Sequence, residues 1–309
     1  MAEFNYGGQA IIEGVMMRGS KSVAIAVRDP SGQIVVQREP LNAFIYQGPI
    51  SKIPVLRGLT SLWDALVLGI RALMRSADIA LGEEEGVEFS GPVAWGTMAL
   101  SLALGVGLFF LLPMFLVSLV DKYISSSLIS SAAEGVIRIL LFIGYIAAIG
   151  LMPDIRRVFA YHGAEHKTIN AYEDGATLEP AAVAKYSTAH TRCGTGFLLI
   201  VLVIYILITA PMGRPPLLIR LVSRLVTIPI VAGISYELMK YGARHYDNPL
   251  VKALVAPGLA LQRLTTREPD ESMLEVAIAS LKSVLEAEEL AEESAEGQME
   301  QETRQAEAL

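Results

Sequence analysis

The stretch PVAWGTMALSLALGVGLFFLLPMFLVSLV, from Pro92 to Val120, carries no charged side chain. It exceeds the ~20 apolar residues with which an α-helix crosses the hydrocarbon core of a bilayer. The rest of the chain agrees, because 52% of its 309 residues are hydrophobic, only 18% are charged and the mean hydropathy is +0.45. A charged fraction this low is atypical of soluble domains and predicts an α-helical integral membrane protein.

Three more segments have the hydropathy and length of membrane spans: Gly135–Met152, Phe197–Met212 and Leu217–Met239. The sequence therefore predicts a membrane domain of about four transmembrane helices over residues 92–239, with a loop at 153–196. Lys and Arg in the short flanks number nine on the side of the chain termini and at most five on the other side. The positive-inside rule then places both termini and the 153–196 loop in the cytoplasm.

The first 54 residues contain no apolar run long enough to span, and they predict a small, β-rich cytoplasmic unit. Lys21–Val27 and Gln33–Arg38 are rich in Val and Ile and flank the turn Asp29-Pro-Ser-Gly32, which is typical of a β-hairpin. The glycine-punctuated segment Gly7–Gly19 is predicted to form a further strand.

Residues 55–81 have the pattern of an amphipathic helix. Apolar side chains recur every three or four residues, at Leu56, Leu59, Trp63, Leu66, Ile70, Leu73, Ala77 and Leu81, and charged side chains occupy the opposite face. Two interpretations fit equally well: a helix packed on the β-rich unit, or a helix that lies along the membrane surface.

Two cytoplasmic helices are predicted over residues 240–285. The first, Leu250–Thr266, is amphipathic and interrupted at Ala256-Pro-Gly258, and the second begins after an N-cap at Asp270. The acidic end at 286–309, rich in Glu, Gln, Ala and Ser, is predicted to be disordered. It accounts for the net charge of −7, since residues 283–309 hold nine Glu and one Arg. A near-neutral remainder without a basic, aromatic-rich patch argues against nucleic acid as a partner.

The motif His162-Gly-Ala-Glu-His166 lies in the 153–196 loop. Residues four apart share one face of a helix, so His162 and His166 could offer two imidazoles to one metal ion. The order H-x-x-E-H is the reverse of the zinc-protease signature, in which the Glu acts as general base. This pattern predicts a zinc site with Glu165 as the catalytic residue.

A third metal ligand could come from His190, Cys193 or Glu237. His190 and Cys193, the chain's one cysteine, lie near the start of the third predicted span, and Glu237 lies near the inner end of the fourth. Binding by both histidines of the motif together with His190 and Cys193 would close the tetrahedron and make the metal structural, whereas three ligands would leave a position open for hydrolysis. A plainer interpretation has the two motif histidines only hydrogen-bonding at a helix end, and another has Cys193 acting as a nucleophile with His190.

Polar residues also stand in apolar or glycine-rich surroundings at both ends of the chain. They are Gln9, Glu13, Arg18, Gln262, Arg263, Arg267 and Glu268. Because polar groups at a buried seam must be paired, we expect them to join the N-terminal unit to the C-terminal helices.

Four blocks of the sequence resemble the YqhQ-like family of bacterial multi-spanning membrane proteins of unknown function. They are Gly7–Gly19, Tyr161–Glu173, His190–Thr195 and Pro257–Pro269, and the resemblance extends from about Gly7 to Leu285. Members are often described as predicted metal-dependent enzymes. The resemblance thus implies a metal block at His162, Glu165 and His166, a second block at His190 and Cys193, and a place in the bacterial inner (plasma) membrane.

The sequence favours a membrane-embedded, Zn²⁺-dependent hydrolase, a peptidase being one such enzyme, with its site on the cytoplasmic side. The alternative is a non-enzymatic scaffold or assembly factor with a structural metal or none. The expected partners are the lipid bilayer and, for the scaffold, membrane or cytoplasmic proteins. A transporter is disfavoured because few ionisable residues lie near the middle of the spans.

Overall fold

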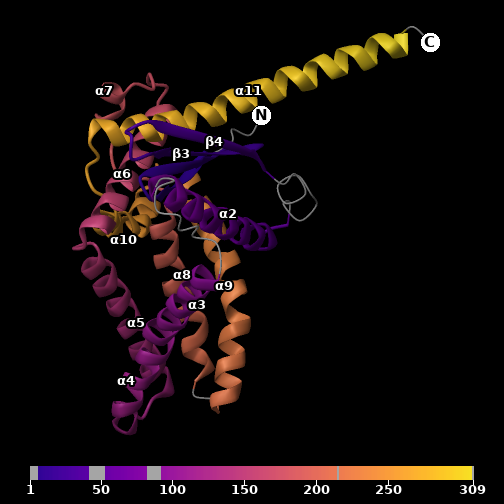
Figure 1. Ribbon diagram of the computed structural model, residues 1–309. Helices are drawn as coiled ribbons and strands as arrows, with labels where there is room; N and C mark the ends of the chain where they lie inside the picture. Colours follow the sequence, from indigo (N-terminus) through magenta and orange to yellow (C-terminus); the bar gives the residue numbers. More distant parts are fainter. Residues whose placement is uncertain (1–5, 42–52, 82–91, 214–215, 308–309) are drawn as a thin grey trace.

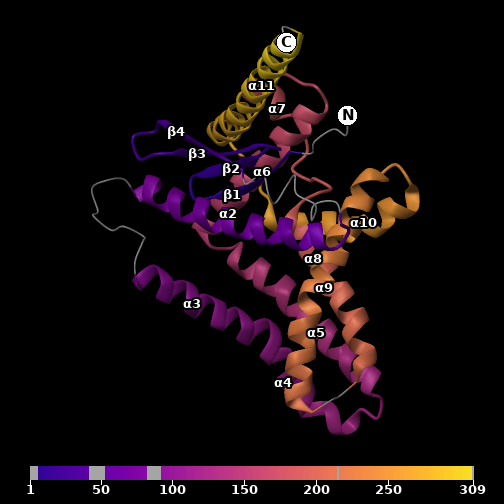
Figure 2. The ribbon, with the colours of Figure 1, turned by 90° about the vertical axis from the view of Figure 1, so that its right-hand side faces the viewer.

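A computed structural model describes residues 6–41, 53–81, 92–213 and 216–307, with the backbone alone at 92–94, at several positions between 217 and 225, and beyond 290. The ends of the predicted β-rich unit, at 1–5 and 42–52, lie outside the described residues. The protein has two parts, a bundle of long helices and a head in which a sheet is covered by shorter helices (Figures 1 and 2). The described chain begins in the head, and its last helix starts there and projects well beyond the sheet (Figure 1).

The head is built on an antiparallel sheet in the order β1-β2-β3-β4. Its strands are β1 (Gly7–Ile11), β2 (Gly14–Arg18), β3 (Ser22–Arg28) and β4 (Ile34–Pro40). The predicted hairpin is confirmed as β3 and β4, and Gly32 supplies a positive φ of 86° in its turn. Gly7–Gly19 forms two strands rather than the single strand predicted, because the chain reverses at Glu13, which adopts a φ of 51°.

Both faces of the central strands are covered, so the head has three layers. Val15, Met17, Ala24 and Ala26 pack against α6 (Pro153–Glu173) and α11 (Glu271–Glu307). The alternate side chains Met16, Val23, Ile25 and Val27 turn to the other face, where α2 (Leu56–Leu81) lies. This two-sided burial explains why β2 and β3 read as continuous apolar runs.

Helix α2 packs on the sheet with its small side chains and leaves most of its apolar stripe exposed. Gly69, Ala72 and Ser76 are buried, whereas Trp63 is 67% and Leu66 55% exposed. The helix lies between the sheet and the bundle, across the direction of the long helices (Figure 2). An apolar face left open at this level suits a helix lying in the membrane surface.

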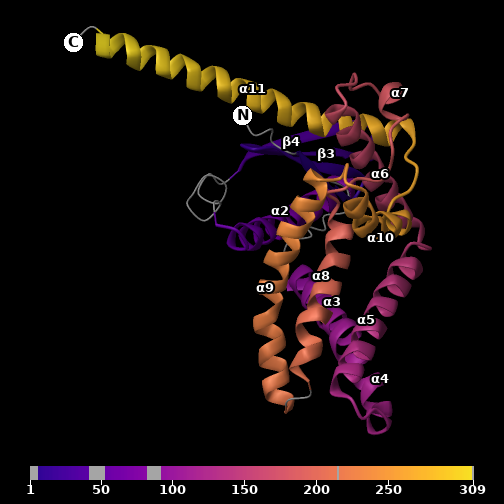
Figure 3. The ribbon, with the colours of Figure 1, turned by 180° about the vertical axis from the view of Figure 1, so that it is seen from behind.

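The bundle contains three helices long and apolar enough to cross a membrane, among the residues described: Trp95–Tyr123, Ser127–Ile149 and Gly194–Met212. They correspond to α3 (Pro92–Val106) continued by α4 (Leu112–Val120), to α5 (Ser127–Ile149), and to α8 (Gly194–Thr209). The fourth predicted span, Leu217–Met239, forms most of α9 (Leu217–Arg244), which lies beside α8 (Figure 3). Helix α9 is not one of the three helices in the described part of the chain that are long and apolar enough to cross a membrane.

An ion pair lies in the middle of the bundle rather than at its edge. The predicted span Gly135–Met152 has Arg138 near its outer end, but α5 begins earlier, at Ser127, so Arg138 falls near the helix centre. Its guanidinium donates to Glu134 Oε1 at 2.7 Å and, from Nε, to the carbonyl of Phe109 at 2.8 Å. Phe109 belongs to a π-helical turn, η3 (Gly107–Leu111), where the regular backbone ladder is interrupted. Arginine thus ties two apolar helices together through groups that lipid could not satisfy.

The C-terminal helices differ from the predictions in two places. Helix α10 (Pro249–Thr265) continues through Pro257, where a break was expected. Helix α11 extends to Glu307, so the tail predicted to be disordered from 286 is helical, apart from residues 308–309, which lie outside the described residues. Its Ala, Glu and Gln are strong helix formers. Moreover, Glu288 is buried and accepts hydrogen bonds from Tyr6 and from the backbone of Ser20 and Lys21.

If α2 lies in the membrane surface, Trp63 must contact acyl chains. In a Trp95→Phe variant Trp63 is the one remaining tryptophan. We expect lipids brominated near the headgroup end of the acyl chain to quench its fluorescence strongly, and lipids brominated near the chain terminus to quench it weakly. Quenching of Trp63 by water-soluble iodide, without quenching by either brominated lipid, would place α2 in solvent.

Removal of Arg138 should destabilise the bundle, because the Glu134 carboxylate would lose its guanidinium in an apolar setting. We expect Arg138→Ala to lower the free energy of unfolding by about 3–5 kcal/mol, the scale for breaking a buried pair. The double variant Glu134→Gln/Arg138→Met should lose less. Unfolding by denaturing detergent, followed by circular dichroism, compares the two; equal losses would contradict a paired role.

Candidate metal centre

Helix α6 carries His162, Glu165 and His166 on one side of its buried second half. The two imidazole rings lie 4.4 Å apart, and His166 and Glu165 are almost fully enclosed. Gly163 permits this packing, since a Cβ at its position would lie 2.1 Å from the carbonyl oxygen of Arg267. The glycine in the motif therefore brings α6 against the segment that follows α10.

Backbone carbonyls fix the orientation of both rings. His162 Nδ1 lies 2.9 Å from the carbonyl oxygen of Thr265, and His166 Nδ1 lies 2.6 Å from that of Thr188. A carbonyl can only accept, so each Nδ1 carries the proton and each Nε2 keeps a free lone pair. Histidines that bind metals are commonly held in this way.

Cys193 completes a group of three. It is the N-cap residue of α8, and its Sγ lies 3.4 Å from Thr195 N and 3.3 Å from His162 Nε2. The ligand atoms of His162, His166 and Cys193 all lie within 4.8 Å of one another. Tetrahedral zinc, with bonds of about 2.0–2.3 Å, would hold such atoms about 3.3–3.6 Å apart. The three side chains therefore fit a metal ion after small adjustments, and the helix N-terminus favours the negative charge of a thiolate.

The other two predicted ligands do not belong to this group of three. The His190 ring lies 5.6 Å from the His166 ring, but its Nε2 is 3.6 Å from Glu173 Oε2, and Oε1 of the same carboxylate pairs with Arg192. Burial alone would raise the pKa of Glu173, but His190 and Arg192 outweigh it and hold that pKa below its usual value. Glu237 accepts hydrogen bonds from Nε and Nη2 of Arg57, and the two side chains form an ion pair between α9 and α2. The proposal of Glu237 as a ligand did not anticipate this guanidinium, which lies far away in the sequence.

Glu165 lies beside the group without belonging to it. Its Oε2 is 3.9 Å from His162 Nε2, and its side chain is 6% exposed. Gly8 of β1 lies directly against it, because a Cβ on Gly8 would come within 2.9 Å of Glu165 Cγ. A carboxylate at this distance can take a proton from a ligand in the fourth metal position, or fill that position itself.

Sequence reasoning named Gln262 and Glu268 as polar residues of a seam but did not connect them with the site, and it missed Lys167. Gln262 accepts from His190 N at 2.9 Å and donates to His190 O at 2.8 Å, clamping α10 to the loop before α8. Lys167 donates to the carbonyl of Ala184 at 2.7 Å and pairs with Glu268 at 2.5 Å. Glu13, expected to help join the N-terminal unit to the C-terminal helices, pairs instead with Arg157 of α6, which donates through Nε and Nη2. Only the type of these residues, polar in apolar surroundings, could have pointed to them.

Fold and site together define a helical membrane protein with a sheet-containing head and a His/His/Cys group at the junction of the two. The chain belongs to the family described as a protein of unknown function (DUF1385), whose profile matches residues 53–287. It is 36% identical over 301 residues to the uncharacterized protein YqhQ of Bacillus subtilis (strain 168), a match that covers 94% of this chain and 95% of that protein. No solved structure matches the chain. The family resemblance is thus confirmed, while the family description gives no activity.

Metal content tests the three-ligand group. The purified protein should contain about one zinc or similar divalent ion per chain, and His162→Ala or Cys193→Ser should lose most of it, because two ligands bind weakly. His190→Ala and Glu237→Gln are the matched controls and should keep it. Metal content is measured by inductively coupled plasma mass spectrometry. Loss of metal from His190→Ala would instead support a closed four-ligand site.

Proposed function

We propose that the protein is a membrane-embedded, metal-dependent hydrolase whose site lies on the cytoplasmic side of the membrane. The observation that carries the proposal is a group of three ligands, His162, His166 and Cys193, with one further carboxylate close by. Three protein ligands are the number that catalytic zinc sites use, because a fourth position must stay open. A bound divalent ion would act there as a Lewis acid that polarises a substrate oxygen and activates water.

In this proposal each residue has a separate task. His162 and His166 bind through Nε2, while Thr265 and Thr188 hold their Nδ1 protons and keep the rings in place. Glu165 takes the proton from the attacking water and returns it to the leaving group. The burial of Glu165 and His166 keeps bulk water from competing.

The position of the site supports a substrate drawn from the membrane. Cys193 starts α8, a candidate membrane span, whereas α6 lies in the head (Figure 1). The centre therefore lies at the level where the bundle meets the head. If the head is cytoplasmic, as the distribution of Lys and Arg indicates, hydrolysis takes place at the inner membrane surface. A peptide and a lipid ester are both within reach there.

One observation favours a second chemistry. Cys193 Sγ and His162 Nε2 are 3.3 Å apart at a helix N-terminus, which is the relation of a nucleophilic thiol to its base. The sequence had paired Cys193 with His190, but His162 is the nearer imidazole. A thiol nucleophile would work without metal and would be blocked by iodoacetamide, whereas metal-ligated Cys193 would be protected until a chelator is added.

A substitution at Glu165 separates an enzyme from a scaffold. We expect Glu165→Gln to keep its metal but to lose hydrolysis by about 10²-fold or more, the range for a general base. Because the proposal names no single substrate, the wild type and the variant are incubated with membrane lipids and membrane peptides in H₂¹⁸O. Products that carry ¹⁸O are then compared by mass spectrometry.

The outcomes are distinct. Labelled products from the wild type alone support the proposal. Equal labelling by the variant removes Glu165 as the base. Absence of labelled product, together with loss of metal from Glu165→Gln, would make Glu165 a fourth ligand and the site a structural one, as a scaffold requires.

A further inference from the structure

A second site is formed where the sheet meets the end of α9. A cavity of about 440 Å³ is lined there by residues of β1, β2, α2 and α9 and by Arg192 of the loop before α8. Four of its lining residues are cations, Arg18, Arg192, Lys240 and Arg244, and none of the described lining residues is acidic. Four positive charges around one cavity of this size favour an anion as its occupant.

Neighbouring acids balance only half of this charge. Arg192 pairs with Glu173, and Arg18 interacts with Asp64. Lys240 and Arg244 make no hydrogen bond or ion pair within the part of the chain that the structure describes. Burial, helped by the charges of Arg57 and Arg244, lowers the pKa of Lys240, and Glu237 only partly opposes this. An arrangement that crowds like charges is costly until an anion binds.

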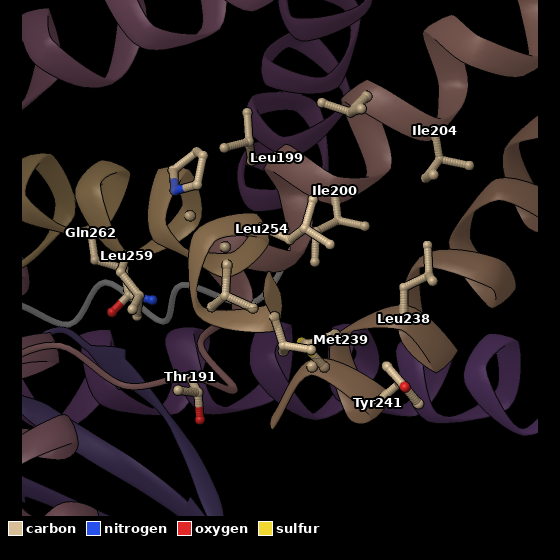
Figure 4. A pocket seen from close by; sticks show the side chains of 17 residues that line it. Thr191, Leu199, Ile200, Ile204, Leu238, Met239, Tyr241, Leu254, Leu259 and Gln262 are labelled. Atoms are coloured by element: carbon tan, nitrogen blue, oxygen red, sulfur yellow. The ribbon is translucent and has the colours of Figure 1, made fainter. Parts of the chain in front are cut away.

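An apolar cavity lies on the other side of the same helix. It measures about 400 Å³ between α8, α9 and α10, and its lining is almost entirely aliphatic, with Leu199, Ile200 and Leu254 prominent (Figure 4). Met239 lines both cavities, and the successive residues Thr191 and Arg192 line one each. The charged and the apolar spaces are therefore adjacent, as the two ends of an amphiphile are.

Their level in the molecule fits a membrane lipid. Met239 ends the fourth predicted span, so Lys240 and Arg244 come at the height where lipid headgroups lie. The uncovered apolar stripe of α2 is at the same level (Figure 2). Basic pockets beside membrane helices on the cytoplasmic side are typical sites for anionic headgroups.

We propose that the basic cavity binds the phosphate of an anionic membrane lipid and that the apolar cavity holds part of an acyl chain. Lys240 and Arg244 contact the phosphate, and Met239 separates the headgroup from the chain. This inference concerns binding and stands whether or not the metal centre hydrolyses anything. The cavity nevertheless adjoins that centre, since Gly8 lines it and lies against Glu165.

Three ligands separate the possible sources of the affinity. Phosphatidylglycerol carries both phosphate and chains, diacylglycerol carries the same chains without phosphate, and glycerol 3-phosphate carries phosphate without chains. Each is titrated into the full-length protein in neutral detergent, and binding is followed by native mass spectrometry and by the shift in melting temperature. We expect phosphatidylglycerol to bind at least tenfold more tightly than either of the others, because only it fills both cavities.

Substitutions assign the phosphate to its residues. Lys240→Gln/Arg244→Gln should weaken phosphatidylglycerol binding by about tenfold or more, as expected when charge-assisted hydrogen bonds are removed, and should leave diacylglycerol binding unchanged. Lys240→Arg/Arg244→Lys keeps the charge and should keep most of the affinity. The matched control is Lys252→Gln/Arg263→Gln, which removes two exposed cations of α10 that line neither cavity.

Two results would overturn the proposal. Phosphatidylglycerol binding that is the same in the Lys240/Arg244 double variant and in the wild type would show that the phosphate does not lie in this cavity. Binding of glycerol 3-phosphate as tight as that of the lipid would make the ligand a soluble phosphate and leave the apolar cavity without a part. A double variant that elutes as aggregate is replaced by Lys240→Gln alone, for which a loss of about threefold or more is expected and an unchanged affinity contradicts the proposal.

Discussion

The structure depends on the hydrogen bonds that non-helical backbone groups receive at the boundary between the bundle and the head. Gln262 forms two hydrogen bonds with the backbone of His190, one as acceptor and one as donor, and is itself almost fully buried. A few residues later, Arg267 N donates to the carbonyl of Phe159 in α6. Buried peptide groups that lack partners are costly, and apolar lipid offers none. The end of α10 therefore supplies the hydrogen bonds that let α6, α8 and the loop between them meet at one point.

The candidate metal centre is a product of this meeting. Its candidate ligands come from the middle of α6 and the N-cap of α8, and the carbonyls that orient its histidines come from the loop and from the end of α10. Elsewhere in the head, ion pairs join acids and bases, as between Glu13 and Arg157 and between Lys167 and Glu268. Two places in the described part of the chain differ from this pattern: the group around His162, where two Nε2 lone pairs converge on a sulfur, and the cavity beside Lys240, where positive charge is in excess. Departures from pairing mark the places where a ligand is expected.

Several elements could be predicted because their cause is local. The β3–β4 hairpin follows from alternation around a Pro-Gly turn, and the apolar helices follow from length and hydropathy alone. The acidic tail was taken as disordered from its composition, yet it continues α11. A distant contact fixes the start of this segment, because Glu288 is held by Tyr6 and Ser20 from the other end of the chain. The apolar stripe of α2 left two interpretations open, and the structure bears on one of them: small residues on the opposite face allow close approach to the sheet, while most of the stripe stays exposed.

The sequence by itself determined the class of protein, the two-part division and the face of α6 that bears His162, Glu165 and His166, since helical periodicity and hydropathy act over a few turns. It also gave three candidates for a third ligand. Only the tertiary structure decided which of them lies beside the two histidines, because Cys193 is brought to His162 by the packing of α8 and α10. Glu237 instead pairs with Arg57, about 180 positions away in the chain. Pairings of this kind depend on which surfaces bury one another, and no local pattern records them.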